Sequence, residues 1–172
     1  MANESITLYK LIILYTLSKV DAPLPPGIIS DYITNHGYTN YFTLQNAFGE
    51  LLEADLIAED KTYHISYYRI TDTGKETLEL FGHPLSRDIR EEINGYLAEN
   101  KYEIINETSL ISDYHLTSEG TYVASCVLRE GNHILFRLEL DVTTEEDARK
   151  ICDNWQSQSE VLYQQAIRGL LG

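Results

Sequence analysis

Histidine and cysteine are the side chains that most often bind transition metals or act as nucleophiles, and the sequence holds few of them. Its five histidines share no metal-ligand spacing, and Cys126 and Cys152 lack the Cys-x-x-Cys pattern of a zinc site. There is also no glycine-rich phosphate loop, no nucleophile elbow and no His-Glu-x-x-His motif. We therefore expect no enzyme activity, no cofactor and no metal, and we expect both cysteines to be small buried apolar residues.

The charge balance and the apolar runs restrict the partners of this chain. In 172 residues, 27 carboxylates face 13 lysines and arginines, which gives a formal charge of −14. This balance disfavours non-specific affinity for nucleic acid, because phosphate must be neutralised by Lys and Arg. The longest purely apolar run, Leu11–Leu14, is far shorter than the roughly 20 residues that a membrane span needs. The N-terminus lacks the basic region of a signal peptide, so we expect a cytoplasmic protein without membrane contact.

Residues 1–82 are expected to form one domain of helices and a hairpin. The segment 4–18 is apolar nearly all round, which predicts a helix buried on more than one side. In a chain this small, a partner subunit could supply the second side. A short helix is expected over 27–35, and a third from Thr39 or Tyr41 to about Ala54. Strands at 56–57 and 63–68 are expected to join through the polar stretch 59–61, before a helix capped by Thr71 or Asp72.

Residues 83–172 are expected to form a second domain, divided from the first at Gly82. The pattern predicts a helix over 85–99, one or two strands over 102–116, and strands over 121–128 and 133–142 joined by a hairpin turn at 130–132. Thr143 and Glu146 form a predicted capping box for a long last helix, whose apolar stripe is weakened at Ser159. Such a helix on a small sheet often packs against a partner. We therefore expect a homodimer through the first helix, the last helix or both.

Three helices followed by a β-hairpin is the element order of a winged helix-turn-helix. Residues 43–57 resemble the third helix of bacterial winged-helix regulators of the MarR and PadR types, and residues 68–78 resemble the segment that closes their wing. Through residues 10–15, 38–45 and 151–155 the whole chain also resembles a bacterial family of unknown function, whose members are predicted transcriptional regulators. The expected fold class is α+β, with an N-terminal winged helix-turn-helix followed by a small antiparallel sheet and a long C-terminal helix.

This resemblance implies a sequence-specific, homodimeric regulator that binds double-stranded DNA, with a second domain for dimerisation or for sensing a small-molecule effector. Residues at the start of the third helix would then meet phosphate: Tyr38, Thr39, Asn40 and Tyr41. Side chains further along would reach base edges, since Gln and Asn pair bidentately with adenine: Thr43, Gln45 and Asn46. Hairpin residues would touch the DNA backbone or minor groove: Lys61, Thr62 and His64.

The sequence departs from the regulator pattern in its charges. Asn46 stands where an arginine is common, Asp55 stands where glycine usually ends the helix, and no Lys or Arg occurs between Lys19 and Lys61. The alternative is a winged helix that contacts proteins through an acidic surface and has no DNA affinity, in which Gln45 and Asn46 only solvate a helix. A DNA-binding face should gather cations beside Gln45 and Asn46, drawn from this set: Lys10, Lys19, Lys61, Arg69 and Lys75.

Overall fold

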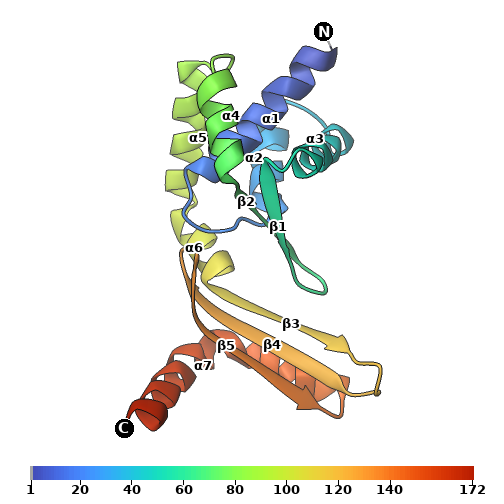
Figure 1. The fold of residues 1–172 in the computed structure, drawn as a ribbon, viewed down its shortest axis with the longest axis vertical. Helices are drawn as coiled ribbons and strands as arrows, with labels where there is room; N and C mark the ends of the chain where they lie inside the picture. Colours follow the sequence, from blue (N-terminus) through green and yellow to red (C-terminus); the bar gives the residue numbers. More distant parts are fainter. Residues whose placement is uncertain (1) are drawn as a thin grey trace. The chain divides into compact units, whose positions relative to one another are not determined.

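The computed structural model describes the backbone of residues 2–172 and the side chains from Thr7 onward. These residues form seven helices and two antiparallel sheets, which confirms the α+β class (Figure 1). The chain divides into two compact units. The first holds the chain up to Lys61 together with Ser66–Ile105, and the second holds Thr62–Ile65 and Asn106–Gly172. Within residues 2–172, no helix is both long and apolar enough to cross a membrane.

The first unit contains five helices and a two-stranded hairpin, in the order that the sequence predicts. Their bounds are α1 (Ala2–Ser18), α2 (Pro26–Asn35), α3 (Tyr41–Glu53), β1 (Ile57–Lys61), β2 (Ser66–Ile70), α4 (Asp72–Phe81) and α5 (Arg87–Glu99). Leu24 adds an antiparallel bridge to Tyr68 of β2, with N···O distances of 2.8 and 2.7 Å. The segment that follows α1 is thereby fixed to the hairpin.

Helix α1 is the centre of the first unit. Every residue from Leu11 to Leu17 is buried, including Thr16, whose hydroxyl donates to the Ile12 carbonyl at 2.8 Å. Helices α3, α4 and α5 and strand β2 all contact α1. The prediction of burial on more than one side is confirmed for this stretch. Its cover comes from the same chain, so Leu11–Leu17 offers no free face to a partner subunit.

Two local features join α4 to the hairpin. Thr71 caps α4 by accepting from the Gly74 N–H at 3.0 Å, and its own hydroxyl donates to the Asp55 carbonyl at 2.7 Å. A Cβ at Gly74 would lie 2.0 Å from the Leu56 carbonyl oxygen, so only glycine allows this approach. Asp55 itself has φ +55°, in the left-handed region that favours glycine. Asp55, which stands where the regulator pattern usually has glycine, therefore lies in a left-handed turn.

The boundary between the two units lies after Ile105 rather than at Gly82. Leu85, Ile93 and Ile104 belong to the same apolar cluster as α1, because the apolar face of α5 packs onto the first unit. The polar stretch 59–61 also differs from expectation. It forms the end of β1, paired Asp60↔Tyr67 and Lys61↔Ser66, and the turn is Thr62–Ile65.

The second unit contains a three-stranded sheet covered on one face by a long helix. Its elements are β3 (Leu110–Leu116), β4 (Tyr122–Glu130), β5 (His133–Val142) and α7 (Glu145–Leu171), and the strand order is β3-β4-β5. Trp155 anchors α7, since its indole Nε1–H donates to the Val127 carbonyl at 3.1 Å. Gly131, at φ +56°, opens the predicted turn between β4 and β5.

Two sequence expectations in this region are wrong. Residues 101–109 form a helix, α6 (Lys101–Ser109), because the buried side chains of Ile104 and Thr108 recur at helical spacing. The cap of α7 is Thr144 rather than Thr143. Its hydroxyl accepts from the Asp147 N–H at 3.1 Å and donates to the Asp147 carboxylate at 2.7 Å.

Candidate nucleic-acid interface

Asn40 fixes the start of α3. Its side-chain oxygen accepts from both the N–H and the hydroxyl of Thr43, at 3.0 and 3.2 Å. Leu44, Phe48 and Leu51 then bury one side of the helix in the core. The opposite side is therefore held rigidly in solvent. We call this surface the α3 face, and it consists of Phe42, Gln45, Asn46, Gly49 and Glu53.

Gln45 and Asn46 lie together on the α3 face with free amide groups. Both are exposed, and among the described residues neither side chain makes a hydrogen bond. Phe42 is 79% exposed on the same face, and the neighbouring Tyr41 is 59% exposed. Phe42 was not among the residues predicted for this site. Phe42 lies four residues before Asn46 and six before Phe48, so it falls on the side of α3 that carries Asn46 and away from the buried side. That spacing could have predicted its exposure from the sequence.

Tyr38, a predicted phosphate contact, makes contacts with other parts of the first unit. Its hydroxyl donates to the Glu92 carboxylate of α5 at 2.8 Å, and its carbonyl accepts from the Tyr9 hydroxyl at 2.6 Å. Burial and the bond to Glu92 raise the pKa of the Tyr38 phenol. The Tyr38 hydroxyl is therefore already bonded within the first unit. Of the predicted phosphate contacts, Tyr41 is well exposed, Thr39 is half-exposed and Asn40 is the cap.

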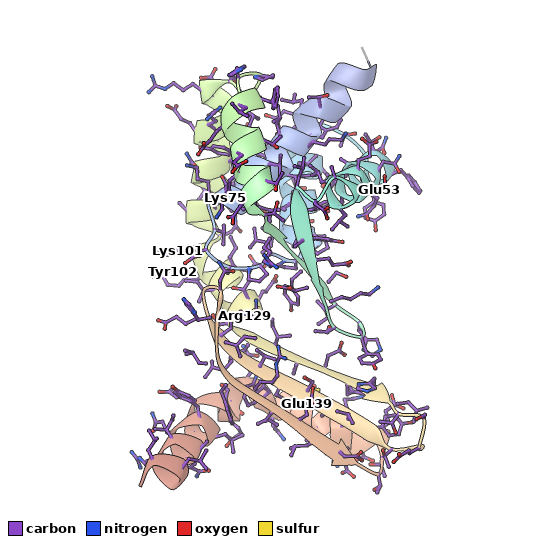
Figure 2. The ribbon with its side chains drawn as sticks, in the orientation of Figure 1. Glu53, Lys75, Lys101, Tyr102, Arg129 and Glu139 are labelled. Carbon is purple, nitrogen blue, oxygen red and sulfur yellow. The ribbon has the colours of Figure 1, made fainter. Side chains whose placement is uncertain are left out.

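The five candidate cations of the first unit are mostly paired, and Lys10 is the one whose ion pair is with α3. Lys10 forms an ion pair with Glu50 of α3, Arg69 lies 3.7 Å from Asp60, and Lys75 lies 3.5 Å from Asp72. Lys19 lies over the ring of Tyr15. Of the five candidate cations, only Lys61 has neither an ion pair nor a ring contact within the described part of the chain. Glu53 lies on α3 in Figure 2, exposed and without an ion pair among the described side chains.

The hairpin turn belongs to the second unit. The N–H and hydroxyl of Thr62 donate to the Ile65 carbonyl at 2.8 and 3.0 Å, which closes the turn. The His64 N–H donates to Asp113 at 2.7 Å, and its Nδ1 lies 2.5 Å from the other carboxylate oxygen. Burial alone would raise the pKa of Asp113, but hydrogen bonds from His64, Thr62 and Tyr114 lower it overall. Both predicted residues of this turn therefore have partners within the chain.

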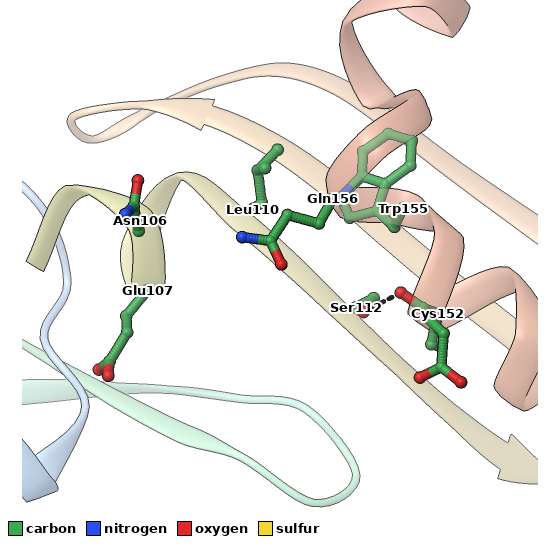
Figure 3. Close-up of a pocket in the computed structure, with 8 residues that line it drawn as sticks. Asn106, Glu107, Leu110, Ser112, Cys152, Trp155 and Gln156 are labelled. Carbon is green, nitrogen blue, oxygen red and sulfur yellow. Dashed lines mark hydrogen bonds between the residues drawn. The ribbon is translucent and has the colours of Figure 1, made fainter. Parts of the chain in front are cut away.

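The second unit also holds an open polar cavity of about 420 Å³ between α6, β3 and α7 (Figure 3). Glu107, Ser112 and Gln156 contribute polar groups, and the Ser112 hydroxyl donates to the Cys152 carbonyl at 3.2 Å. Burial raises the pKa of the Cys152 thiol, and it raises that of the fully buried Cys126 to about 12. No group of three or more His, Cys, Asp and Glu side chains within the described chain could hold a metal ion.

Comparison with known proteins places the chain in a family. No curated protein and no solved structure matches it. A match does extend over residues 9–170, which includes both units, and it is to a domain of unknown function rather than to the MarR- or PadR-type regulators. The chain therefore belongs to the family described as domain of unknown function (DUF4364).

Proposed function

We propose that the first unit is a winged helix that binds double-stranded DNA and that the protein is a cytoplasmic transcriptional regulator. The carrying observation is the adjacent pair Gln45 and Asn46, exposed, without hydrogen bonds among the described residues, and held on a helix whose other side is buried. The element order of α1 to α4, with a hairpin between α3 and α4, supports the assignment of α3 as the recognition helix.

In this proposal α3 enters the major groove. Gln45 and Asn46 present the amide pair that matches the N6 and N7 edge of adenine, and the Thr43 methyl group contacts a thymine methyl group. Lys61 contacts a phosphate beside the groove. Two copies of α3 in a homodimer would meet half-sites about one helical turn apart, and the cavity of the second unit would accept a small-molecule effector.

Because most candidate cations are paired, we expect phosphate contacts to contribute less to DNA affinity than they do in most regulators. With Lys61 as the free cation, phosphate contacts contribute little, so recognition depends on base edges more than in most regulators. Binding should therefore be weak and only mildly sensitive to salt.

The test is selection of binding sites from a randomised duplex library at low salt. We expect enrichment of a motif containing adenine, and loss of that motif in the Gln45→Ala, Asn46→Ala double variant. Gln165→Ala, an exposed glutamine on α7, is the matched control and should leave the motif unchanged. Failure to enrich any motif, or the same motif from the double variant, would reject α3 as the recognition helix.

A second candidate is a protein-binding module, and the exposed aromatic pair Tyr41 and Phe42 favours it. An exposed aromatic ring beside carboxylates suits a partner segment with an apolar side chain flanked by Lys or Arg. A library of such peptides would test this function. Phe42→Ala should abolish peptide binding, whereas a DNA-binding α3 should keep its motif preference in that variant.

A further inference from the structure

Strand β5 forms an open edge of the sheet in the second unit. The order β3-β4-β5 leaves its outer side without a partner strand among the described residues. Its ten residues span about 33 Å, and most of their side chains are exposed, including Ile134, Leu135 and Leu140. Native proteins often protect such an edge with proline, lysine or a short strand, and β5 has none of these. Its only edge-protecting features are the charges of Arg137, Glu139 and Asp141 and the bulge at Leu135. From this edge we infer that β5 pairs antiparallel with β5 of a second copy, centred on Leu138.

The charges of β5 select this register. A two-fold axis normal to the sheet keeps every residue on its own face, so each residue opposes one an even number of positions away. Centring on Leu138 places Arg137 opposite Glu139 of the second copy, and the symmetry repeats the pair. Centring on Arg137 would oppose that residue to its own copy. Centring on Glu139 would oppose Glu139 to itself and leave the first three residues of β5 unpaired, although it would also oppose Arg137 to Asp141. Like charges directly opposite destabilise a sheet, and only the Leu138-centred register opposes Arg137 to Glu139 without any such pair. Centring on Phe136 would leave the last three residues of β5 unpaired.

The two charged side chains are free to make these pairs. Within the described chain, neither Arg137 nor Glu139 forms an ion pair, and their neighbours on β4 are the uncharged Val127 and Ser125. Glu139 is labelled on the sheet in Figure 2. The second copy therefore supplies the opposite charges that these residues lack.

The other face of β5 is apolar, as an interface requires. Leu138, Leu140 and Val142 line a groove of about 440 Å³ between the sheet and α7. In the Leu138-centred register Leu140 lies opposite Phe136 of the second copy. The alternation of faces ends before Phe136, because the pairing of β5 with β4 skips Leu135. The pairing thus continues the apolar side chains of one groove into those of the other.

Helix α7 supplies further apolar surface beside this edge. The ring of Tyr163 still packs near Phe136 of β5, with centroids 6.0 Å apart. Beyond it Ile167 is exposed, and Leu170 and Leu171 are 86% and 79% exposed. The two-fold axis leaves both α7 helices on the same side of the joined sheet. The apolar side chains of β5 and α7 in the second copy therefore lie on that same side. This interface differs from one made by helices alone, and it stands whether or not the first unit binds DNA.

The experiment is sedimentation equilibrium of the full chain with charge-swap variants. We expect a dimer for the natural sequence, and a dimer dissociation constant that is about tenfold or more higher for Arg137→Glu and for Glu139→Arg, because each creates two like-charge oppositions. The double variant carrying both changes restores opposite charges and should restore the dimer. Glu119→Arg, an exposed change of equal charge outside β5, should leave it unaffected.

Each other outcome would overturn the inference. A monomeric natural sequence at all accessible concentrations would exclude the dimer. A dimer unaffected by either single variant would place the interface elsewhere. Loss of the dimer in both single variants without recovery in the double variant would exclude the Leu138-centred register. Circular dichroism of every variant checks that the sheet remains folded.

Discussion

The Lys10–Glu50 ion pair allows a sharp prediction about DNA binding. In the natural protein the Glu50 carboxylate neutralises the one cation that contacts α3 from α1. Glu50→Gln removes that carboxylate and keeps the shape of the side chain, so Lys10 becomes free to contact phosphate. Glu53→Gln removes a carboxylate from the same helix without releasing a cation, and it is the matched control.

The size of the effect follows from counterion release. Each additional cation that contacts phosphate steepens the plot of log Kobs against log salt by about 0.9. For one protomer this makes the Glu50→Gln variant about 3.5-fold more sensitive than the natural sequence to a change from about 50 to 200 mM salt. Glu53→Gln should strengthen binding by relieving repulsion but should leave the slope unchanged.

Fluorescence anisotropy of a labelled duplex, titrated at several salt concentrations, measures both slopes. The duplex should carry the motif obtained by selection. Equal slopes for Glu50→Gln and Glu53→Gln would show that Lys10 lies too far from phosphate to contact it. A steeper slope for Glu53→Gln would contradict the statement that Glu53 neutralises no cation on the α3 face.

Three further predictions concern stability, each read from urea unfolding. Gly74→Ala should destabilise the first unit by about 3 kcal/mol or more, because its Cβ would clash with the Leu56 carbonyl at 2.0 Å. Asp55→Gly should stabilise by up to about 1 kcal/mol, because φ +55° strains a residue with a Cβ. Asp113→Asn should destabilise at neutral pH by weakening the contact with His64. Since the folded state lowers the pKa of Asp113, that loss should be complete above the ordinary carboxylate pKa of about 4 and should shrink as pH falls through the folded pKa.

Each of these variants has a control. Gly49→Ala, on the exposed side of α3, adds a Cβ that meets no atom within 4 Å and should stabilise the first unit slightly. Glu53→Gly, at the end of α3, should not reproduce the gain of Asp55→Gly. The fluorescence of Trp155, the single tryptophan, reports the second unit for Asp113→Asn. A pH-independent difference between Asp113→Asn and the natural sequence would contradict the lowered pKa.

Strong periodicity made the helices of the first unit predictable. Leu44, Phe48 and Leu51 recur at helical spacing and are all buried, and the apolar segment 4–18 correctly indicated burial on several sides for Leu11–Leu17. The origin of that cover was not predictable. Helix α5, which carries the buried Ile93, contacts α1 from far along the chain, and local periodicity does not specify which apolar faces meet.

The sequence predicted which residues of the candidate site are exposed, but not the long-range hydrogen bonds that some of them make. Exposure of Gln45 and Asn46 follows from their place opposite the core stripe. The bonds of Tyr38 to Glu92 and of His64 to Asp113 join residues far apart in the chain, and no local pattern carries that information. The helix α6 was mistaken for a strand because its few apolar residues alternate loosely as well as periodically.

The burial of α1 has a consequence for how the chain folds during synthesis. The ribosome makes Leu11–Leu17 well before the helices that enclose them, and the last of these helices to be made is α5, with Ile93. Until then the nascent chain carries an apolar segment without its native neighbours, which is the kind of segment that holdase chaperones bind. The first unit is thus expected to fold late in its own translation, and a ribosome stalled before α5 would display α1 to such chaperones.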